Sequence, residues 1–94
     1  MKIAARIDAN QPGIVEGLRK AGASVQTLGQ VGDGCPDLLV GFRGVNYLME
    51  IKDPDKPPSK RRLNSRQQWW HEAWRGQVEK VETIEQAYAI IGLV

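Results

Sequence analysis

The sequence GCPDLLVGFRGVNYLMEIKD, residues 34–53, predicts a β-hairpin, and the rest of the fold can be worked out from it. Two apolar segments, 37–42 and 45–52, flank Arg43-Gly44, a pair that favours the two-residue turn of a hairpin. Both segments contain the aliphatic and aromatic residues that are typical of strands. Charged residues nevertheless stand at the outer ends of both segments, so the first question is where these charges meet.

The register of this hairpin decides how its charged ends are arranged. If the turn has two residues, the pairing continued along both strands places Asp37 opposite Glu50. Opposed residues point to the same face of a sheet, with Cβ atoms about 5 Å apart. Lys52 follows Glu50 by two residues and therefore lies on that face as well. A turn with an odd number of residues would instead put the two carboxylates on opposite faces.

Asp37, Glu50 and Lys52 together indicate a site for hydrolysing a phosphodiester. Two facing carboxylates destabilise a hairpin unless one is protonated or a cation lies between them. Carboxylate oxygens are ligands that Mg²⁺ accepts, with water and substrate phosphate completing the coordination shell. A lysine beside them can stabilise developing negative charge or orient the attacking water. The alternative is that Asp37 is a plain turn residue and that Glu50 and Lys52 are simply solvated.

Periodicity and turn residues predict the elements around the hairpin. A strand that leaves a hairpin and returns to the sheet after one helix implies a mixed sheet covered by helices. We therefore expect an α/β fold in a single domain spanning residues 1–94. The Pro-rich segment 53–64 is expected to be a loop. The expected elements are helix 8–22, strands 24–28, 37–42 and 45–52, helix 65–75, strand 77–81 and helix 84–91.

The helix predicted after the Pro-rich segment contains several residues of interest. Asn64 suits the N-cap, and Gln67 stands three residues later, as in a capping box. Trp70 and Trp74 are one turn apart, and we expect both to lie in the core. His71 is the single histidine, and without a neighbouring ligand residue we expect it on the helix surface or behind the site.

Composition excludes few classes of protein. The chain has 94 residues, of which 41% are hydrophobic and 26% charged, as in ordinary soluble domains. Its formal charge of +2 is too small to identify a partner. Cys35 is the only cysteine, so we expect a small buried thiol and a reducing compartment. No apolar run has the length of a signal peptide or a membrane span, so we expect no membrane association.

Basic residues are concentrated between the second hairpin strand and the following helix. The segment SKRRLNSR, residues 59–66, contains four basic side chains and no acid. Positive charge beside the proposed metal site would attract a phosphate backbone and position it without reading sequence. The alternative is a solvated loop. The candidate DNA-binding residues are Lys56, Lys60, Arg61, Arg62 and Arg66.

These motifs resemble those of a known superfamily. Pro36-Asp37, followed after twelve residues by Glu50-Ile51-Lys52, resembles the PD-(D/E)XK nuclease motif. The expected element order is similar to the restriction-endonuclease-like αβββαβ core of that superfamily, with a C-terminal helix added. Residues 34–53 and LNSRQQWWHEAWRGQV, residues 63–78, resemble more narrowly the virus-type replication-repair nuclease (VRR-NUC) family. The resemblance is to its short stand-alone members, many of them phage-encoded, and it covers residues 8–91.

The resemblance implies roles for individual residues. Asp37 and Glu50 would bind the metal through their side chains, and Ile51 through its backbone carbonyl. Lys52 matches the family lysine that works with the attacking water. Gln67 matches a glutamine that points at the active site in this family, a role that would compete with the capping box for its side chain.

A further acidic ligand is often contributed by the first helix in this family. Gly13 occupies a place where related chains often have Glu, so the assignment here rests on other acids. Glu16 lies within the expected helix and is favoured, with Asp8 near the helix start as the alternative.

The predicted function is that of a Mg²⁺- or Mn²⁺-dependent DNA endonuclease. The resemblance implies a homodimer similar to Holliday-junction resolvases, selective for branched DNA, in the cytoplasm of a bacterium or a phage-infected host. One alternative is a flap or nicking nuclease. Another is a non-catalytic DNA-binding module that has kept the nuclease fold, although intact Asp37, Glu50 and Lys52 favour an enzyme.

Overall fold

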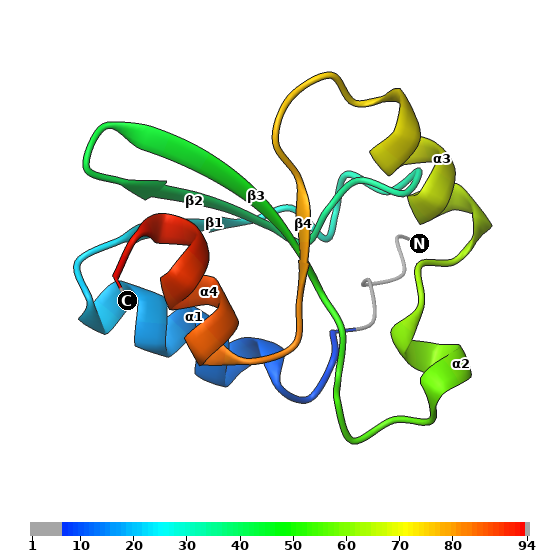
Figure 1. The fold of residues 1–94 in the computed structure, drawn as a ribbon, viewed down its shortest axis with the longest axis horizontal. Helices are drawn as coiled ribbons and strands as arrows, with labels where there is room; N and C mark the ends of the chain where they lie inside the picture. The colour runs from blue at the N-terminus through cyan, green and yellow to red at the C-terminus, as the bar shows by residue number, and fades with distance from the viewer. Residues whose placement is uncertain (1–6, 94) are drawn as a thin grey trace.

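The computed structural model describes residues 7–93 and contains a four-stranded mixed sheet with the strand order β1-β2-β3-β4 (Figure 1). The β1–β2 and β2–β3 pairs are antiparallel, and β3 pairs with β4 in parallel. The expected α/β class with flanking helices is confirmed. Residues 1–6 and 94, the ends of the expected domain, lie outside the described residues. The elements are α1 (Gln11–Lys20), β1 (Ser24–Thr27), β2 (Leu38–Phe42), β3 (Val45–Ile51), α2 (Pro58–Arg61), α3 (Ser65–Ala73), β4 (Glu79–Val81) and α4 (Ile84–Ile91).

The turn of the hairpin has the two residues that the sequence predicts. Arg43 and Gly44 both have positive φ angles, 51° and 79°, as a type I′ turn requires. Phe42 accordingly pairs with Val45. The even-numbered turn confirms the predicted register and removes the alternative in which the carboxylates separate.

Alternation along the hairpin divides its side chains between the two faces of the sheet. Leu38 pairs with Met49, and both are completely buried. Figure 1 shows α1 and α4 next to each other on the side of this face. Gly17 permits their close approach, because a Cβ there would lie 2.7 Å from an Ile84 side-chain atom. The core consists of Ile14, Val15, Leu18, Ala23, Leu38, Val40, Met49, Ile51, Val81, Ala87 and Ile91.

The segment predicted as a loop contains a short helix, α2. Pro57 occupies its N-cap, and its carbonyl accepts a hydrogen bond from the Lys60 amide at 2.8 Å. Pro58 is tolerated because the first turn of a helix leaves its N–H groups without intrahelical partners. A loop was therefore the wrong prediction for residues 58–61. A Pro-rich segment can still form a single turn when its prolines stand at the start.

The prediction that Trp70 and Trp74 lie in the core is wrong. Helix α3 has no fully buried residue, and Trp74 is 47% exposed. The two indoles instead stack on each other with centroids 4.6 Å apart. The reason is the position of α3, which lies apart from the α1–α4 pair that encloses the core (Figure 1).

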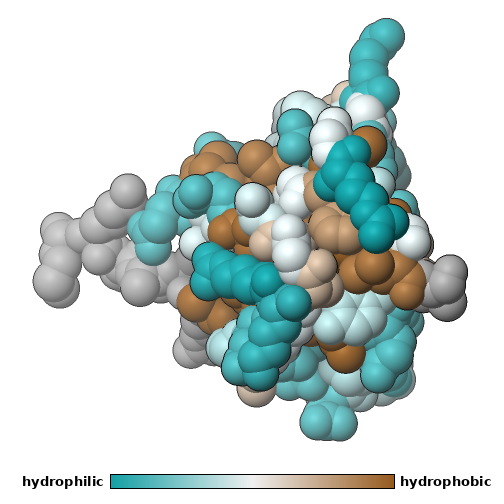
Figure 2. All heavy atoms as spheres, turned by 90° about the vertical axis from the view of Figure 1, so that its left-hand side faces the viewer, coloured by the Kyte–Doolittle hydropathy of each residue, from teal (hydrophilic) through white to brown (hydrophobic). Residues whose placement is uncertain are grey.

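The end of the molecule with the hairpin turn faces the viewer in Figure 2. Hydrophobic residues form several separate areas on this side, divided by long hydrophilic side chains. Val45, next to the turn, is one of the large hydrophobic residues that are exposed. Among residues 7–93, no helix is long and apolar enough to cross a membrane.

Candidate active site

The charged ends of the hairpin come together on the face of the sheet opposite the core. Asp37 and Glu50 lie immediately beyond Leu38 and Met49, the pair at the end of the antiparallel ladder. Oδ2 of Asp37 accepts a hydrogen bond from the Ile51 amide at 2.7 Å, which ties the start of β2 to the end of β3. Nζ of Lys52 lies 4.0 Å from Oε2 of Glu50. The structure thus brings together the three residues at the centre of the predicted site.

Gln67 joins this group from α3. Its Oε1 accepts a hydrogen bond from Nζ of Lys52 at 2.7 Å, and its Nε2 donates to Oε2 of Glu50 at 3.1 Å. The same Oε1 accepts the Asn64 amide at 3.0 Å, while the Gln67 amide donates to Oδ1 of Asn64 at 2.9 Å. The expected competition between cap and active site is wrong, because one carbonyl oxygen has two lone pairs and serves both. The capping box therefore holds Gln67 against the end of β3.

Glu50 is the most perturbed carboxyl in the site. Its side chain is almost entirely buried, and the residue is 2% exposed. Burial and then the negative charge of Asp37 raise the pKa of Glu50 from 4.5 to about 9. Glu50 is therefore protonated at neutral pH unless a cation lies nearby. Its Oε1 is buried and has no hydrogen-bond partner among the described residues.

These features fit a divalent metal ion with few protein ligands. Oε1 of Glu50 has no hydrogen-bond partner among the described residues, and a cation would offset the charge of Asp37 that helps to keep Glu50 protonated. Within residues 7–93, no three His, Cys, Asp or Glu side chains are grouped as a metal-binding set. Mg²⁺ needs no such cage, since it uses one or two carboxylates together with water and substrate phosphate. Asp37, Glu50 and the Ile51 carbonyl would suffice.

The loop before β2 positions Asp37 by packing on α3. Gly34 has φ +82°, and a Cβ there would lie 2.4 Å from the carbonyl oxygen of Arg66. Only glycine fits this contact, which explains the glycine in the Gly34-x-Pro36-Asp37 pattern. The Asp37 carbonyl accepts the Leu28 amide at 2.8 Å.

Cys35, in the same loop, is half-buried. Burial, then Glu50 and Asp37, raise the pKa of its thiol, so the thiol stays protonated and is a poor nucleophile.

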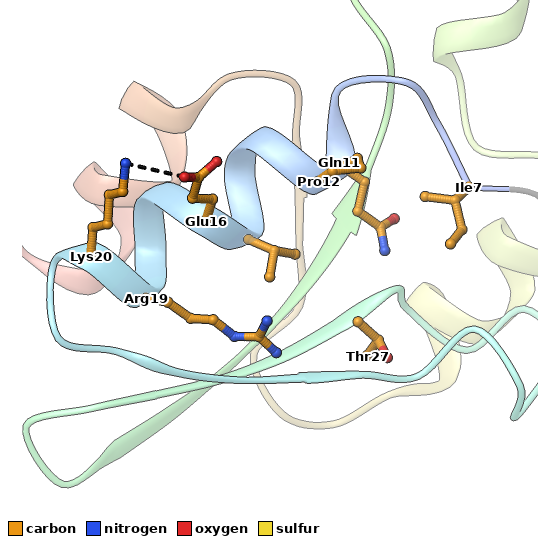
Figure 3. A pocket seen from close by; sticks show the side chains of 8 residues that line it. Ile7, Gln11, Pro12, Glu16, Arg19, Lys20 and Thr27 are labelled. Carbon is orange, nitrogen blue, oxygen red and sulfur yellow. Dashed lines mark ion pairs between the residues drawn. The ribbon is translucent and has the colours of Figure 1, made fainter.

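Glu16 does not join the site. Its carboxylate pairs with Lys20 at 3.1 Å, and its side chain is 67% exposed. Figure 3 shows the two side chains together beside a pocket between α1 and β1. Asp8 is the N-terminal acid whose charge acts on Glu50, and it pairs with Lys56. The sequence could not separate the two acids because the direction of α1 relative to the hairpin is a tertiary property.

Asn10 has a role that the sequence did not indicate. It occupies the N-cap of α1 but makes no capping hydrogen bond. Its Nδ2 donates instead to the carbonyl oxygens of Lys52 and Glu82, both at 2.9 Å. These two residues follow β3 and β4, so Asn10 holds the ends of the two strands together next to Lys52. No local signal distinguishes this from capping.

The basic residues flanking the site differ in what they contact. Lys60 and Arg62 are exposed. Arg66 is also exposed and lies 3.6 Å from Asp33, a surface pair that contributes little stability. Arg61 is half-buried and lies 3.9 Å from Glu82. Lys60, Arg62 and Arg66 therefore present positive charge at the surface, whereas Arg61 and Lys56 face acids of this chain.

His71 is closer to the site than its sequence neighbours suggested. Its Nε2 is buried without a hydrogen-bond partner among the described residues. Burial, and then the positive charge of Lys52, lower the pKa of His71. The sequence signal that could have placed His71 near the site is its spacing of four residues from Gln67, which puts both side chains on one face of α3.

One solved structure, described as a VRR_NUC domain, is similar to this chain. It superposes with a TM-score of 0.63 and 31% sequence identity, over 86% of this chain and 88% of that chain. No protein-family model and no curated protein matches the chain. The chain belongs to the VRR_NUC domain family and is therefore a domain of a nuclease family.

Proposed function

We propose that this chain is a divalent-metal-dependent endonuclease that hydrolyses DNA phosphodiester bonds. The observation that carries the proposal is the buried Glu50 carboxyl, whose ionised form is disfavoured by burial and by the charge of Asp37 and whose Oε1 has no hydrogen-bond partner among the described residues. Ionised Glu50 is costly here unless a cation is bound, and membership of a nuclease family supports a phosphodiester as the substrate.

Each residue of the site has a role in this proposal. Asp37, Glu50 and the Ile51 carbonyl would hold Mg²⁺ or Mn²⁺, and the bound ion would supply charge screening for the carboxylates and a more acidic water molecule. Lys52 orients that water or stabilises the negative charge of the transition state. Gln67 fixes both side chains, since it hydrogen-bonds to Lys52 and to Glu50. Asp8 replaces Glu16 as the N-terminal acid that contributes to the site.

The exposed basic residues provide the approach for DNA. Lys60 and Arg62 belong to or follow α2, and Arg66 lies in the first turn of α3, which also carries Gln67. Their charges concentrate a phosphate backbone beside the metal site. Contacts of this kind recognise shape and position rather than base sequence.

We propose further that the enzyme acts as a homodimer on branched DNA. A domain of 94 residues offers one catalytic site and little recognition surface. A two-fold dimer would present two catalytic sites to a DNA junction, one for each of two strands. Sedimentation or light scattering across a range of concentrations would give the oligomeric state, and a monomer at every concentration with cleavage retained would contradict this part.

The test of the function is cleavage of labelled duplex, flap and four-way-junction DNA with Mg²⁺ or Mn²⁺. The wild type is expected to cleave, with preference for the junction, and Glu50→Gln is expected to lose roughly 10³-fold in rate. Gln68→Ala, an exposed position on α3, is the matched control and should cleave as the wild type does.

Three outcomes would change the proposal. Equal cleavage by Glu50→Gln would show that the active site lies elsewhere. Tight DNA binding with no cleavage under any metal would favour the non-catalytic module. A preference for flaps over junctions would support the flap nuclease instead. Calorimetric titration of Mn²⁺ into both proteins separates loss of metal binding from loss of chemistry.

A further inference from the structure

His71 is a polar residue beside the site for which the proposed mechanism has no use. It follows Gln67 by four residues, one turn of α3, so the two side chains lie along one face of the helix. That face is turned toward β3, because Gln67 contacts Lys52 and Glu50 there. The helix that brings Gln67 to the site therefore brings His71 to it as well.

The hydrogen bonding of His71 is incomplete. Its Nε2 is buried and unpaired within the described part of the chain. An unpaired buried polar group is costly, and such groups in native proteins call for an explanation such as a catalytic role or a bound partner. Oε1 of Glu50, in the same site, is also buried and has no hydrogen-bond partner among the described residues. We take both unpaired atoms as positions that contact a group brought in with the substrate.

The surroundings keep the imidazole neutral and fixed in position. Burial and the charge of Lys52 both lower the pKa of His71, so the ring does not repel the lysine at neutral pH. A neutral imidazole still has one N–H donor. Trp70 packs against the ring in an edge arrangement, with centroids 6.1 Å apart. The ring is thus held on α3, and its Nε2 is buried with no hydrogen-bond partner among the described residues.

The donors that the site offers to a phosphate are partly engaged within the site. One of the two N–H groups on Nε2 of Gln67 already goes to Glu50, and ionised carboxylates can only accept. The Lys52 ammonium has three N–H donors, and one of them goes to Gln67. Phosphodiester hydrolysis places negative charge on the non-bridging oxygens, and a fixed donor near them accelerates the reaction.

We propose that Nε2–H of His71 donates a hydrogen bond to a non-bridging oxygen of the phosphodiester bound at Lys52. His71 is then a further catalytic residue, acting with Lys52 on the substrate phosphate. This inference rests on the proposed nuclease function, and the experiments below separate the two.

The first experiment uses the fact that the chain has one histidine. Nitrogen-15 NMR of the imidazole reports on His71 without overlap, and a short DNA duplex with Ca²⁺ serves as the probe. We expect the Nε2–H tautomer in the complex and a change in the Nε2 signal on addition of DNA. An Nδ1–H tautomer in the complex, or an unchanged Nε2 signal when fluorescence anisotropy shows that DNA is bound, would overturn the inference.

The second experiment compares His71→Phe with His71→Gln. Phenylalanine keeps a ring but has no donor, whereas the glutamine amide can donate from nearly the same place. We expect His71→Phe to lower kcat by roughly 10²-fold with little change in KM, and His71→Gln to recover most of the loss. Thermal unfolding of both variants checks that the fold is kept.

The outcomes distinguish the two proposals. Wild-type cleavage with full activity in His71→Phe overturns the role of His71 and leaves the nuclease function standing. Equal losses in both variants, with a Nε2 signal insensitive to DNA, show a structural role only and also overturn it. Absence of cleavage in the wild type removes the nuclease function, and the NMR experiment still decides whether Nε2 meets a phosphate.

Discussion

The two faces of the β2–β3 hairpin differ more than any other two regions of this molecule. On one face Leu38 and Met49 oppose each other, are completely buried and pack in the core with α1 and α4. On the other face Asp37, Glu50 and Lys52 converge, and α3 reaches them through Gln67. The same strands build a stable apolar layer and an electrostatically costly site.

The difference shows how a small domain accommodates a buried charged site. Alternation along each strand lets residues next to one another in sequence serve opposite purposes. Met49 contributes apolar burial, while Glu50 carries a carboxyl whose pKa is raised to about 9. The free energy gained by burying the apolar face offsets the cost of burying the Glu50 carboxyl on the other face. The predictions below test this division.

The largest effect on stability is expected at Met49. Met49→Ala opens a cavity in the fully buried face and should lower the free energy of unfolding by roughly 2–5 kcal/mol. Leu48→Ala, one residue away on the half-buried face, should cost roughly 1 kcal/mol. Urea denaturation measures both. Equal losses at the two positions would mean that the faces do not differ as described.

Gly34→Ala tests the contact between the loop and α3. The new Cβ would meet the Arg66 carbonyl oxygen at 2.4 Å, at a residue with φ +82°. We expect a loss of roughly 1–3 kcal/mol and a marked fall in cleavage, since Asp37 follows in the same loop. Gly32→Ala is the control, because it has φ +77° but nothing within 4 Å. If both substitutions behave alike, backbone conformation alone matters, and the packing contact does not.

The pH dependence of stability should reveal the cost of the polar face. The folded-state pKa of Glu50 is raised from 4.5 to about 9, so the folded chain holds this proton more tightly than the unfolded chain. The contribution of Glu50 to stability is therefore full below about pH 4.5 and is lost as the pH rises toward 9.

Denaturation of metal-free protein between pH 5 and pH 9 checks this prediction. The wild type should lose stability relative to Glu50→Gln as the pH rises, and Mg²⁺ should restore part of the loss. The difference between the two proteins isolates Glu50 from the other titrating groups. A difference that does not change with pH would contradict the raised pKa.

The smallest effect is expected at Glu16. Glu16→Gln removes an exposed ion pair with Lys20 and should leave cleavage unchanged and stability within about 0.5 kcal/mol. Asp8→Asn, at the acid whose charge acts on Glu50, should lower cleavage measurably. Cleavage rates of both variants, measured side by side under limiting Mg²⁺, test this prediction. A larger loss in Glu16→Gln than in Asp8→Asn would make Glu16 the N-terminal acid of the site, as the sequence predicted.

The sequence predicted most of the helices and strands because turns, caps and periodicity depend only on residues near one another in the chain. The two-residue turn determined the hairpin register, and the spacing of Asn64 and Gln67 identified the start of α3. The short helix α2 was missed because prolines usually interrupt helices, although they suit the first turn. Trp70 was misplaced because helical spacing shows which residues share a face, but not what that face packs against.

The sequence by itself determined the hairpin, the opposition of Asp37 and Glu50, and the presence of Lys52 on their face. Each of these follows from a turn of known length and the two-residue period of a strand. Only the tertiary structure decided that Gln67 serves cap and site together and that the charge of Asp8, not that of Glu16, acts on Glu50. It also decided that the charge of Lys52 acts on His71, whose Nε2 has no hydrogen-bond partner among the described residues. These depend on the packing of α1 and α3 relative to the sheet, which arises from contacts between residues far apart in the chain.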